Sequence, residues 1–235
     1  MALKLGSKGY ALLKMIIMRY SYRLALFVLV VTAILTSVSP GAAAQTKGTR
    51  TLNQPVARVL NENISGRQIE IGNQERNDAK RQYKGAEYEK WVREYEADKL
   101  VSLILNPLLR EYAKTHGITA SVDEINSVSR TIFGKRVARG AIRTIAEATV
   151  IQWKVSKSLY QQYGGTVIFQ QSNPFEPIGA YQKFLEEQQQ KKAFEIYNPQ
   201  LRAAFWCYFT CEQSMIVPPE EVNYDVPWWL QKAKP

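Results

Sequence analysis

The longest run of helical apolar spacing lies in the middle of the chain, over residues 87–116. Its first half places aromatic side chains three or four positions apart, at Tyr88, Trp91 and Tyr95. This spacing puts them on one helical face, and aromatic stripes of this kind usually pack inward. After Lys99 apolar residues cover most of the circumference, which is typical of a helix buried on several sides. We therefore expect the second half to form the centre of the core, around Leu103, Ile104 and Leu108.

Pro107 lies inside this leucine-rich stretch. Because proline has no amide hydrogen and clashes with the preceding turn, it predicts either a kink or a restart of the helix with Asn106 as its cap. Gly117 is expected to end the helix, since glycine readily adopts the left-handed conformation found after helix ends.

Capping boxes predict where two further helices begin. Ser65 is followed three residues later by Gln68, and Ser121 is followed in the same way by Glu124. The first of these helices is very polar, and a third helix follows the second without a clear cap. The expected ranges of the three helices are 65–84, 121–133 and 137–163.

The pattern changes after the glycine pair at residues 164 and 165. The expected elements are then a strand over 166–171, a helix over 178–192, an extended piece over 194–197 and a helix over 201–210. The proline-rich tail, with Trp228 and Trp229, is expected to be a partly exposed extended arm. Together with a short strand at Val56–Leu60, the predicted elements indicate a mainly α fold. It consists of a helical domain over 56–164, followed by a small α+β region over 165–235.

The first 44 residues have the pattern of a secretory signal peptide. Five basic and no acidic residues precede or adjoin an apolar run at Leu24–Val38, and small residues at Ala42 and Ala44 follow it. Cleavage is expected after Ala44, which leaves a leader over 45–55 and places the mature protein in the periplasm or outside the cell. The alternative is a membrane anchor formed by Leu24–Val38, although a bilayer span needs ~20 apolar residues.

Half of the positive charge belongs to this targeting segment. The chain has 31 Lys+Arg and 21 Asp+Glu, a formal net charge of +10, and five of the basic residues lie in residues 1–44, so the remainder carries +5. An exported protein rarely meets nucleic acid, and a modest positive charge suits an anionic membrane surface or acidic polypeptides. The densest basic group could equally be a solvated face. It consists of Lys135, Arg136, Arg139 and Arg143.

Residues with catalytic chemistry are sparse. The single histidine, His116, falls at a predicted helix end, where the helix dipole favours a cation, so a capping role is expected. The sequence shows no histidine-rich metal site, Ser-His-Asp set or glycine-rich phosphate loop, so neither a cofactor nor a catalytic residue is expected. Cys207 and Cys211 are four residues apart, and we expect either a disulfide at a frayed last helical turn or two semi-buried thiols.

Two segments resemble the N-terminal domain of SurA-type periplasmic chaperones. VARVLNENISGRQI, at residues 56–69, is similar to the family's entry segment: a short strand, a turn and a serine-initiated helix. LVSLILNPLLREYAKTHGITASVDEINSVSRTI, at residues 100–132, is similar to its central signature of a leucine-rich helix, a Lys-x-x-Gly-Ile turn and a new helix start. The resemblance covers about 56–163, and Pro107 departs from the family pattern.

The resemblance implies an exported binding protein that holds unfolded or assembling envelope polypeptides, with apolar and aromatic side chains against the client and a positive rim that attracts acidic segments. The side chains expected to contact clients are those of Tyr88, Trp91, Tyr95, Trp228 and Trp229. The family's parvulin domains use histidines, and nothing after Gly165 is similar to them. Two alternatives remain: a parvulin-related peptidyl-prolyl isomerase, and a structural envelope protein with one dedicated partner.

Overall fold

The computed structural model describes residues 53–170 and 173–231 of the chain. The predicted signal peptide, its cleavage site, the alternative anchor at Leu24–Val38 and most of the leader lie outside these residues. Among the helices that the structure describes, none combines the length and the apolar character needed to cross a membrane.

A β-hairpin begins the described part of the chain. β1 (Pro55–Val59) and β2 (Glu62–Ser65) pair antiparallel around Leu60 and Asn61, which both have positive φ, 47° and 72°. A two-residue turn of this kind matches the right-handed twist of the strands it joins. The sequence predicted the turn but missed β2, because only Ile64 of its four residues is apolar.

A strand from near the other end of the chain completes this sheet. β5 (Phe194–Ile196) pairs antiparallel with the open edge of β1, which gives the order β2-β1-β5. A second sheet is the short hairpin of β3 (Ile168–Gln170) and β4 (Asn173–Glu176). The segment of β4 was expected to form a loop because it contains Pro174. In a two-stranded hairpin each strand has a free edge, where proline, which lacks an amide hydrogen, is tolerated.

The rest of the described structure is helical, which confirms the predicted mainly α class. The helices are α2 (Gly66–Ile69), α3 (Asn73–Gln82), α4 (Gly85–Thr115), α5 (Val122–Phe133), α6 (Gly140–Tyr163), α7 (Ile178–Gln190) and α8 (Pro199–Thr210). Two short 3-10 turns, η1 (Pro219–Glu221) and η2 (Trp228–Leu230), lie in the tail. Both predicted capping boxes are present, but the one at Ser65 opens only α2. Residues 70–72 separate α2 from α3, so the single polar helix expected over 65–84 is wrong.

α4 is continuous through Pro107, so the helix does not restart at Asn106. Burial on both sides of the proline holds the two halves in line, because Ile104 is 0% and Leu108 2% exposed. Leu103 is only half-buried at the edge of the core, which corrects its expected central place. The lost helical hydrogen bond is therefore outweighed by packing.

Two apolar cores lie beneath these elements. The larger one surrounds the second half of α4 and includes residues of β1, β5, α7 and α8. The smaller one lies between α5, α6 and the tail. Residues on both sides of Gly164 contribute to the larger core, so the division expected at that glycine does not separate two independent cores.

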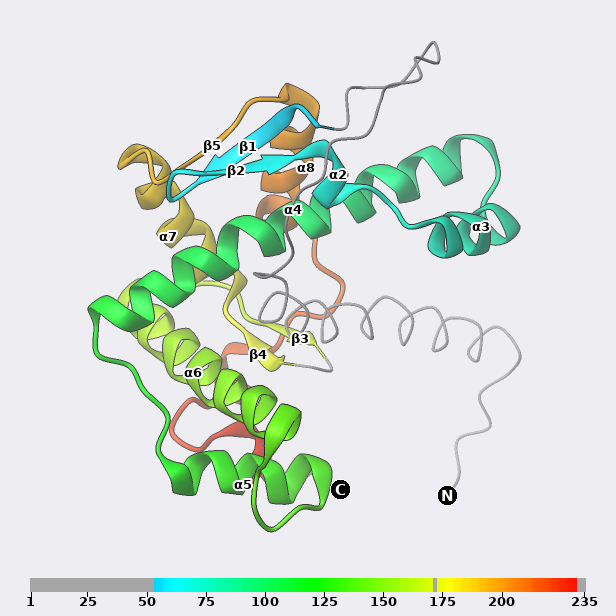
Figure 1. Cartoon of the computed structure of the whole chain (residues 1–235). Coiled ribbons are helices and arrows are strands. Elements are labelled where there is room, and N and C mark those ends of the chain that lie inside the picture. The colour runs from blue at the N-terminus through cyan, green and yellow to red at the C-terminus, as the bar shows by residue number, and fades with distance from the viewer. Residues whose placement is uncertain (1–52, 171–172, 232–235) are drawn as a thin grey trace, which may run out of the picture.

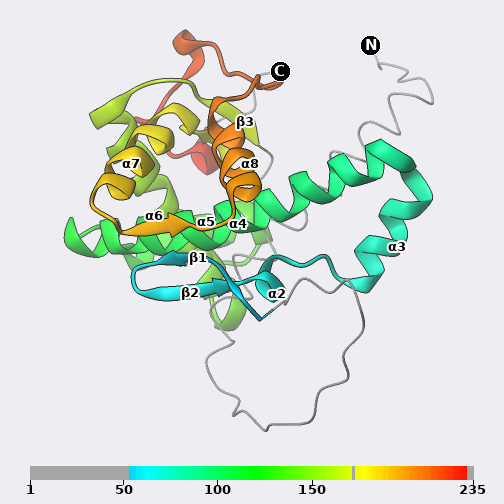
Figure 2. The same cartoon turned by 90° about the horizontal axis from the view of Figure 1, so that it is seen from above.

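α3 and the first half of α4 project beyond both cores (Figure 1). The view from above shows the same projection, with α3 and the start of α4 extending away from the β2-β1-β5 sheet (Figure 2). We call residues 73–99 the arm. None of its residues belongs to either core.

Candidate functional site

The arm carries four aromatic side chains, which we call the aromatic face: Tyr83, Tyr88, Trp91 and Tyr95. Tyr83 lies in the turn between α3 and α4, and its ring stacks on Trp91 at a centroid distance of 6.1 Å. The rings of Trp91 and Tyr95, one helical turn apart, lie 5.3 Å from each other. All four side chains are half-buried. The helical spacing seen in the sequence is therefore real, but it does not place these rings in a core.

Lys99 fixes the base of the arm. Its Nζ donates a hydrogen bond to the carbonyl oxygen of Glu70 at 2.8 Å and lies 4.8 Å from the ring centroid of Tyr95. Burial lowers the pKa of Lys99, and the carboxylates of Glu75 and Glu70 oppose this shift. Arg76 donates to Glu70 Oε1 at 3.2 Å. These contacts hold the segment before α3 against α4, so the aromatic face has a rigid support.

The surface around the aromatic face is charged but nearly neutral overall. Residues 73–99 contain seven Lys or Arg and seven Asp or Glu. Lys80 lies 5.9 Å from the ring centroid of Tyr88, within the range of a cation–π contact. Such a surface can contact apolar segments without selecting strongly for the charge of the partner.

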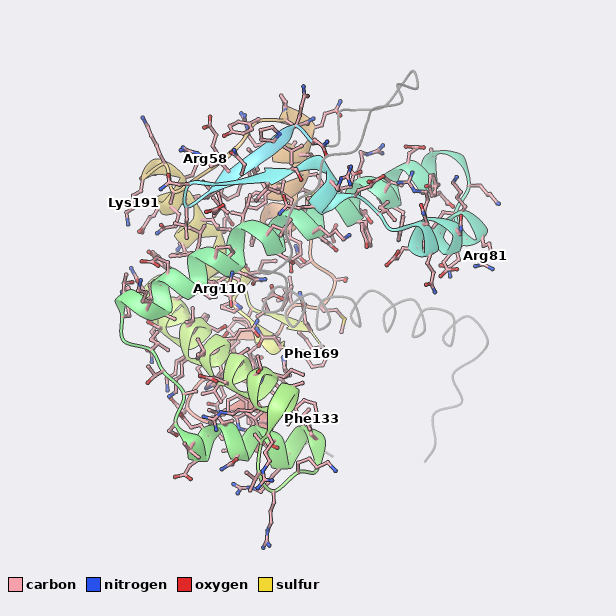
Figure 3. The ribbon with its side chains drawn as sticks, viewed as in Figure 1. Arg58, Arg81, Arg110, Phe133, Phe169 and Lys191 are labelled. Atoms are coloured by element: carbon pink, nitrogen blue, oxygen red, sulfur yellow. A yellow bond between two sulfur atoms is a disulfide. The ribbon has the colours of Figure 1, made fainter. Side chains whose placement is uncertain are left out.

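The predicted basic group lies elsewhere. Lys135 and Arg136 are in the loop between α5 and α6, Arg139 is the N-cap of α6, and Arg143 is in its first turn. Figure 3 labels Phe133, at the end of α5, at one extremity of the molecule and Arg81, on the arm, at another. The basic residues therefore form no positive rim around the aromatic face, and that expectation is wrong.

The two tail tryptophans have different environments. Trp229 is 5% exposed and packs edge-on against Trp153 of α6, with the ring centroids 6.1 Å apart. Beside it the hydroxyl of Tyr224 donates to the Phe175 carbonyl oxygen at 2.8 Å. The aromatic side chains of α6 and β4 provide a site that the tail fills, so the expected exposure of Trp229 is wrong. Trp228 is half-buried at the edge of the same core.

The cysteines form a disulfide, which is one of the two predicted alternatives. Cys207 and Cys211 are bonded, with their Cα atoms 4.8 Å apart. Cys211 follows the last residue of α8 and has extended backbone, which lets its sulfur approach a partner one turn back. Both residues are exposed. The disulfide therefore links the last turn of α8 to the residue that follows the helix, at the protein surface.

His116 is a helix cap, as predicted. It follows the last residue of α4, and its Nδ1 donates to the Tyr112 carbonyl oxygen at 2.8 Å. The imidazole also stacks on the Tyr112 ring at 3.9 Å. The only histidine of the chain is thus engaged in ending α4.

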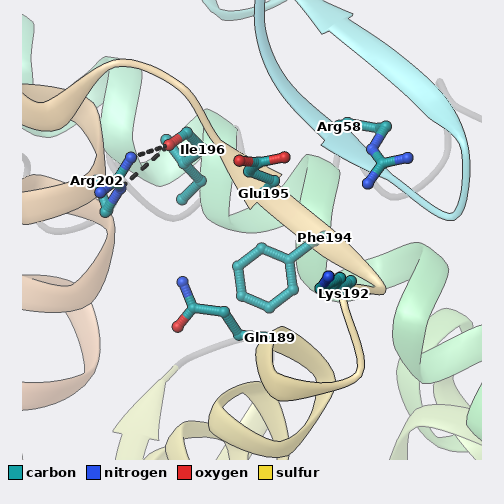
Figure 4. Close-up of a pocket in the computed structure, with 7 residues that line it drawn as sticks. All are labelled: Arg58, Gln189, Lys192, Phe194, Glu195, Ile196 and Arg202. Carbon is teal, nitrogen blue, oxygen red and sulfur yellow. Dashed lines mark hydrogen bonds between the residues drawn. The ribbon is translucent and has the colours of Figure 1, made fainter.

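A hollow of about 350 Å³ lies beside β5 (Figure 4). Its walls include three cationic side chains and one carboxylate. The residues that line it are Arg58, Gln189, Lys192, Phe194, Glu195, Ile196 and Arg202. The guanidinium of Arg202 donates twice to the Ile196 carbonyl oxygen, at 3.1 and 2.7 Å, and so ties α8 to β5. This lining offers charge and hydrogen bonds but no paired nucleophile and base.

The sequence analysis did not identify one buried carboxylate. Glu176, in β4, is 9% exposed and accepts a hydrogen bond from the Tyr208 hydroxyl at 3.1 Å. The same hydroxyl accepts from Gln170 Nε2 at 3.2 Å. The contacts join the β3-β4 hairpin to α8, over 30 residues away. Only tertiary contacts bring these groups together, and no local motif signals them.

Comparisons with known proteins found no match among protein-family models, curated proteins or solved structures. Within the described ranges no group of His, Cys, Asp and Glu has the arrangement of a metal site. Function must therefore be inferred from the chain's own surfaces and from the sequence resemblance.

Proposed function

We propose that this chain is an exported chaperone-like protein that holds unfolded or assembling envelope polypeptides on the aromatic face of its arm. The observation that carries this proposal is the position of Tyr83, Tyr88, Trp91 and Tyr95. All four are half-buried on a projection that contributes to neither core, and the ring of Trp91 contacts those of Tyr83 and Tyr95.

The physical basis is the apolar area that these rings still expose. Covering it with a client segment gains about 25 cal/mol per Å² of apolar surface removed from water. Aromatic side chains contribute large area with few rotatable bonds, so little conformational entropy is lost on contact. The hydroxyls of the tyrosines tolerate polar neighbours. Together these properties suit weak, exchangeable contact with varied extended segments.

Two further observations support the proposal. The two segments that resemble SurA-type chaperones, residues 56–69 and 100–132, lie directly before and after the arm in the sequence. The disulfide between Cys207 and Cys211 is typical of oxidising compartments such as the periplasm. In this mechanism the client is held by passive contact and no bond is broken.

The test is an aggregation assay with an unfolded outer-membrane protein at a stoichiometric ratio. The unaltered chain is expected to delay aggregation, and the double variant Tyr88→Ala/Trp91→Ala is expected to lose most of this delay. The matched control is Tyr197→Ala, since Tyr197 is an aromatic residue off the arm that is 41% exposed. Circular dichroism melts of each variant report whether the fold is intact.

A double variant that melts like the unaltered chain and still delays aggregation would show that the aromatic face does not hold clients. Loss of activity in Tyr197→Ala to the same extent would also contradict the proposal. Trp91→Phe keeps an apolar ring in place and is expected to retain the delay even if the double variant is less stable.

A further inference from the structure

The turn between α5 and α6 concentrates positive charge, and the nearest acidic residues in the sequence are Glu124 on α5 and Glu147 on α6. Five basic side chains, all exposed, lie on or beside it: Arg130, Lys135, Arg136, Arg139 and Arg143. No acidic residue occurs between Ile125 and Ala146. Among the ion pairs found in the described part of the chain, none involves these five side chains. We call this region the basic turn.

Large apolar side chains are exposed among these cations. Val137, in the turn, is 55% exposed, and Ile132, in the last turn of α5, is 42% exposed. Gly134, in the left-handed conformation with φ 64°, ends α5 and starts the loop. Ala138 is 3% exposed, and its amide donates to Asn126 Oδ1 at 3.0 Å. The loop is therefore attached to α5 at Ala138, while Val137 just before it stays in solvent.

We propose that the basic turn docks on an anionic lipid surface. Lys and Arg near such a surface are attracted to its headgroups, by ~1 kcal/mol each. Apolar side chains on the same face enter the boundary between headgroups and acyl chains. An acidic polypeptide would satisfy the cations but gives no reason for valine and isoleucine to be exposed between them. The combination of unpaired cations and apolar side chains favours the lipid.

This inference is independent of the proposed function. The basic turn and the arm lie at different extremities of the molecule (Figure 3). α5 packs against α6 and η2, whereas α3 packs against α4. Docking through the basic turn therefore leaves the aromatic face uncovered, and either surface can fail its test while the other passes.

The experiment places an environment-sensitive fluorophore at the turn of the full chain, through Val137→Cys. The native cysteines are bonded to each other and leave the new thiol as the reactive one. The labelled protein is mixed with vesicles of phosphatidylcholine alone or with phosphatidylglycerol added. Because residues 1–52 are the same in every sample, any vesicle contact through them is common to all. The control label is Leu60→Cys, on the β1-β2 turn, where the side chain is 37% exposed.

We expect a blue-shifted, stronger signal at residue 137 with anionic vesicles only, and no change at residue 60. Reversing two cations by Arg139→Glu/Arg143→Glu should weaken the response to anionic lipid at least ~10-fold, since each lost cation costs about fivefold. The matched control is Arg110→Glu/Lys114→Glu, which reverses two exposed cations at the same spacing on α4.

Four results would overturn the proposal. One is an unchanged signal at residue 137 on anionic vesicles, and another is an equal response to both vesicle types. The third is a response to polyaspartate but not to vesicles, which would identify an acidic polypeptide as the partner. A Leu60 label that responds as strongly as the Val137 label would likewise show that the turn is not the docking site.

Discussion

At the residue scale, the side chain of Glu124 has two structural roles. It completes the capping box of α5 by accepting from the Ser121 amide at 2.8 Å. It also pairs at 2.8 Å with Lys154 of α6, whose Nζ donates in addition to the Thr119 carbonyl oxygen. Partial burial alone would raise the pKa of Glu124, but the hydrogen bonds from Lys154 and Ser121 lower it. The motif was readable in the sequence, whereas the partner on α6 was not.

Glu124→Gln tests this pair, because glutamine keeps the capping acceptor and removes only the charge. A carboxyl group with a lowered folded-state pKa stabilises the fold at pH values above its unfolded pKa of ~4.3, and this contribution is lost as pH falls through the folded value. The variant should therefore unfold at lower urea concentration than the unaltered chain at pH 7. The two midpoints should converge in acid.

The control for this comparison is Lys154→Met, which removes the partner instead of the carboxylate. It should reproduce the loss at pH 7 and keep only part of its effect in acid, because the lost hydrogen bond to the Thr119 carbonyl oxygen does not depend on the charge of Glu124. A gap for Glu124→Gln that persists in acid, once the carboxyl group is protonated in the folded and unfolded states, would show that charge is not what Glu124 contributes.

At the element scale, the tail forms part of the second core. η2 inserts Trp229 against Trp153, and Tyr224 lies 4.9 Å from the same indole. The proline-rich sequence predicted an extended arm correctly in part, since the tail as far as residue 231 has no helical element beyond η1 and η2. It could not predict burial, because a short aromatic segment is buried only if other elements provide a cavity for it.

Trp229→Ala should cost about 3–5 kcal/mol of unfolding free energy, as expected for removing a large buried ring. Trp228→Ala should cost clearly less, because Trp228 is half-buried. Chemical denaturation followed by circular dichroism measures both, and the pair is matched in residue type and position. Equal, small effects of the two substitutions would mean that the tail does not support the fold.

At the scale of the whole molecule, segments from the two halves of the described chain share one sheet and one core. β5 fills the open edge of β1, and α8 packs against α4. The β1-β5 pairing joins residues more than 130 positions apart, Ala57 with Ile196 and Val59 with Phe194. The side chains of all four residues are at most 4% exposed. The helical part therefore depends on the C-terminal part for the completion of its sheet and core.

A fragment of residues 1–164 should consequently fail to fold as a cooperative unit. It lacks β5, α7 and α8, which leaves the apolar face of α4 around Ile104 without its cover. Limited proteolysis should cut the fragment rapidly under conditions in which the full chain resists. Adding a separate 165–235 fragment should restore protection if the shared core explains the instability. A fragment that melts cooperatively by itself would contradict this view.

The sequence by itself determined the local features. Helical spacing, the two capping boxes and the left-handed glycine after α4, Gly117, depend on groups a few residues apart, so their physics is contained in the sequence pattern. The mainly α class and the capping role of His116 followed from the same local geometry, whereas the cysteine spacing left a disulfide and two thiols as alternatives.

Only the tertiary structure decided which surfaces are covered. Tyr88, Trp91 and Tyr95 have the spacing of a core stripe, yet they belong to neither core of the described residues. Trp229 looks exposed in the sequence and is buried, because α6 and β4 form a site for it. The basic residues and the aromatic face lie on different elements that diverge in space. Burial depends on which distant segments meet, and a chain pattern alone does not carry that information.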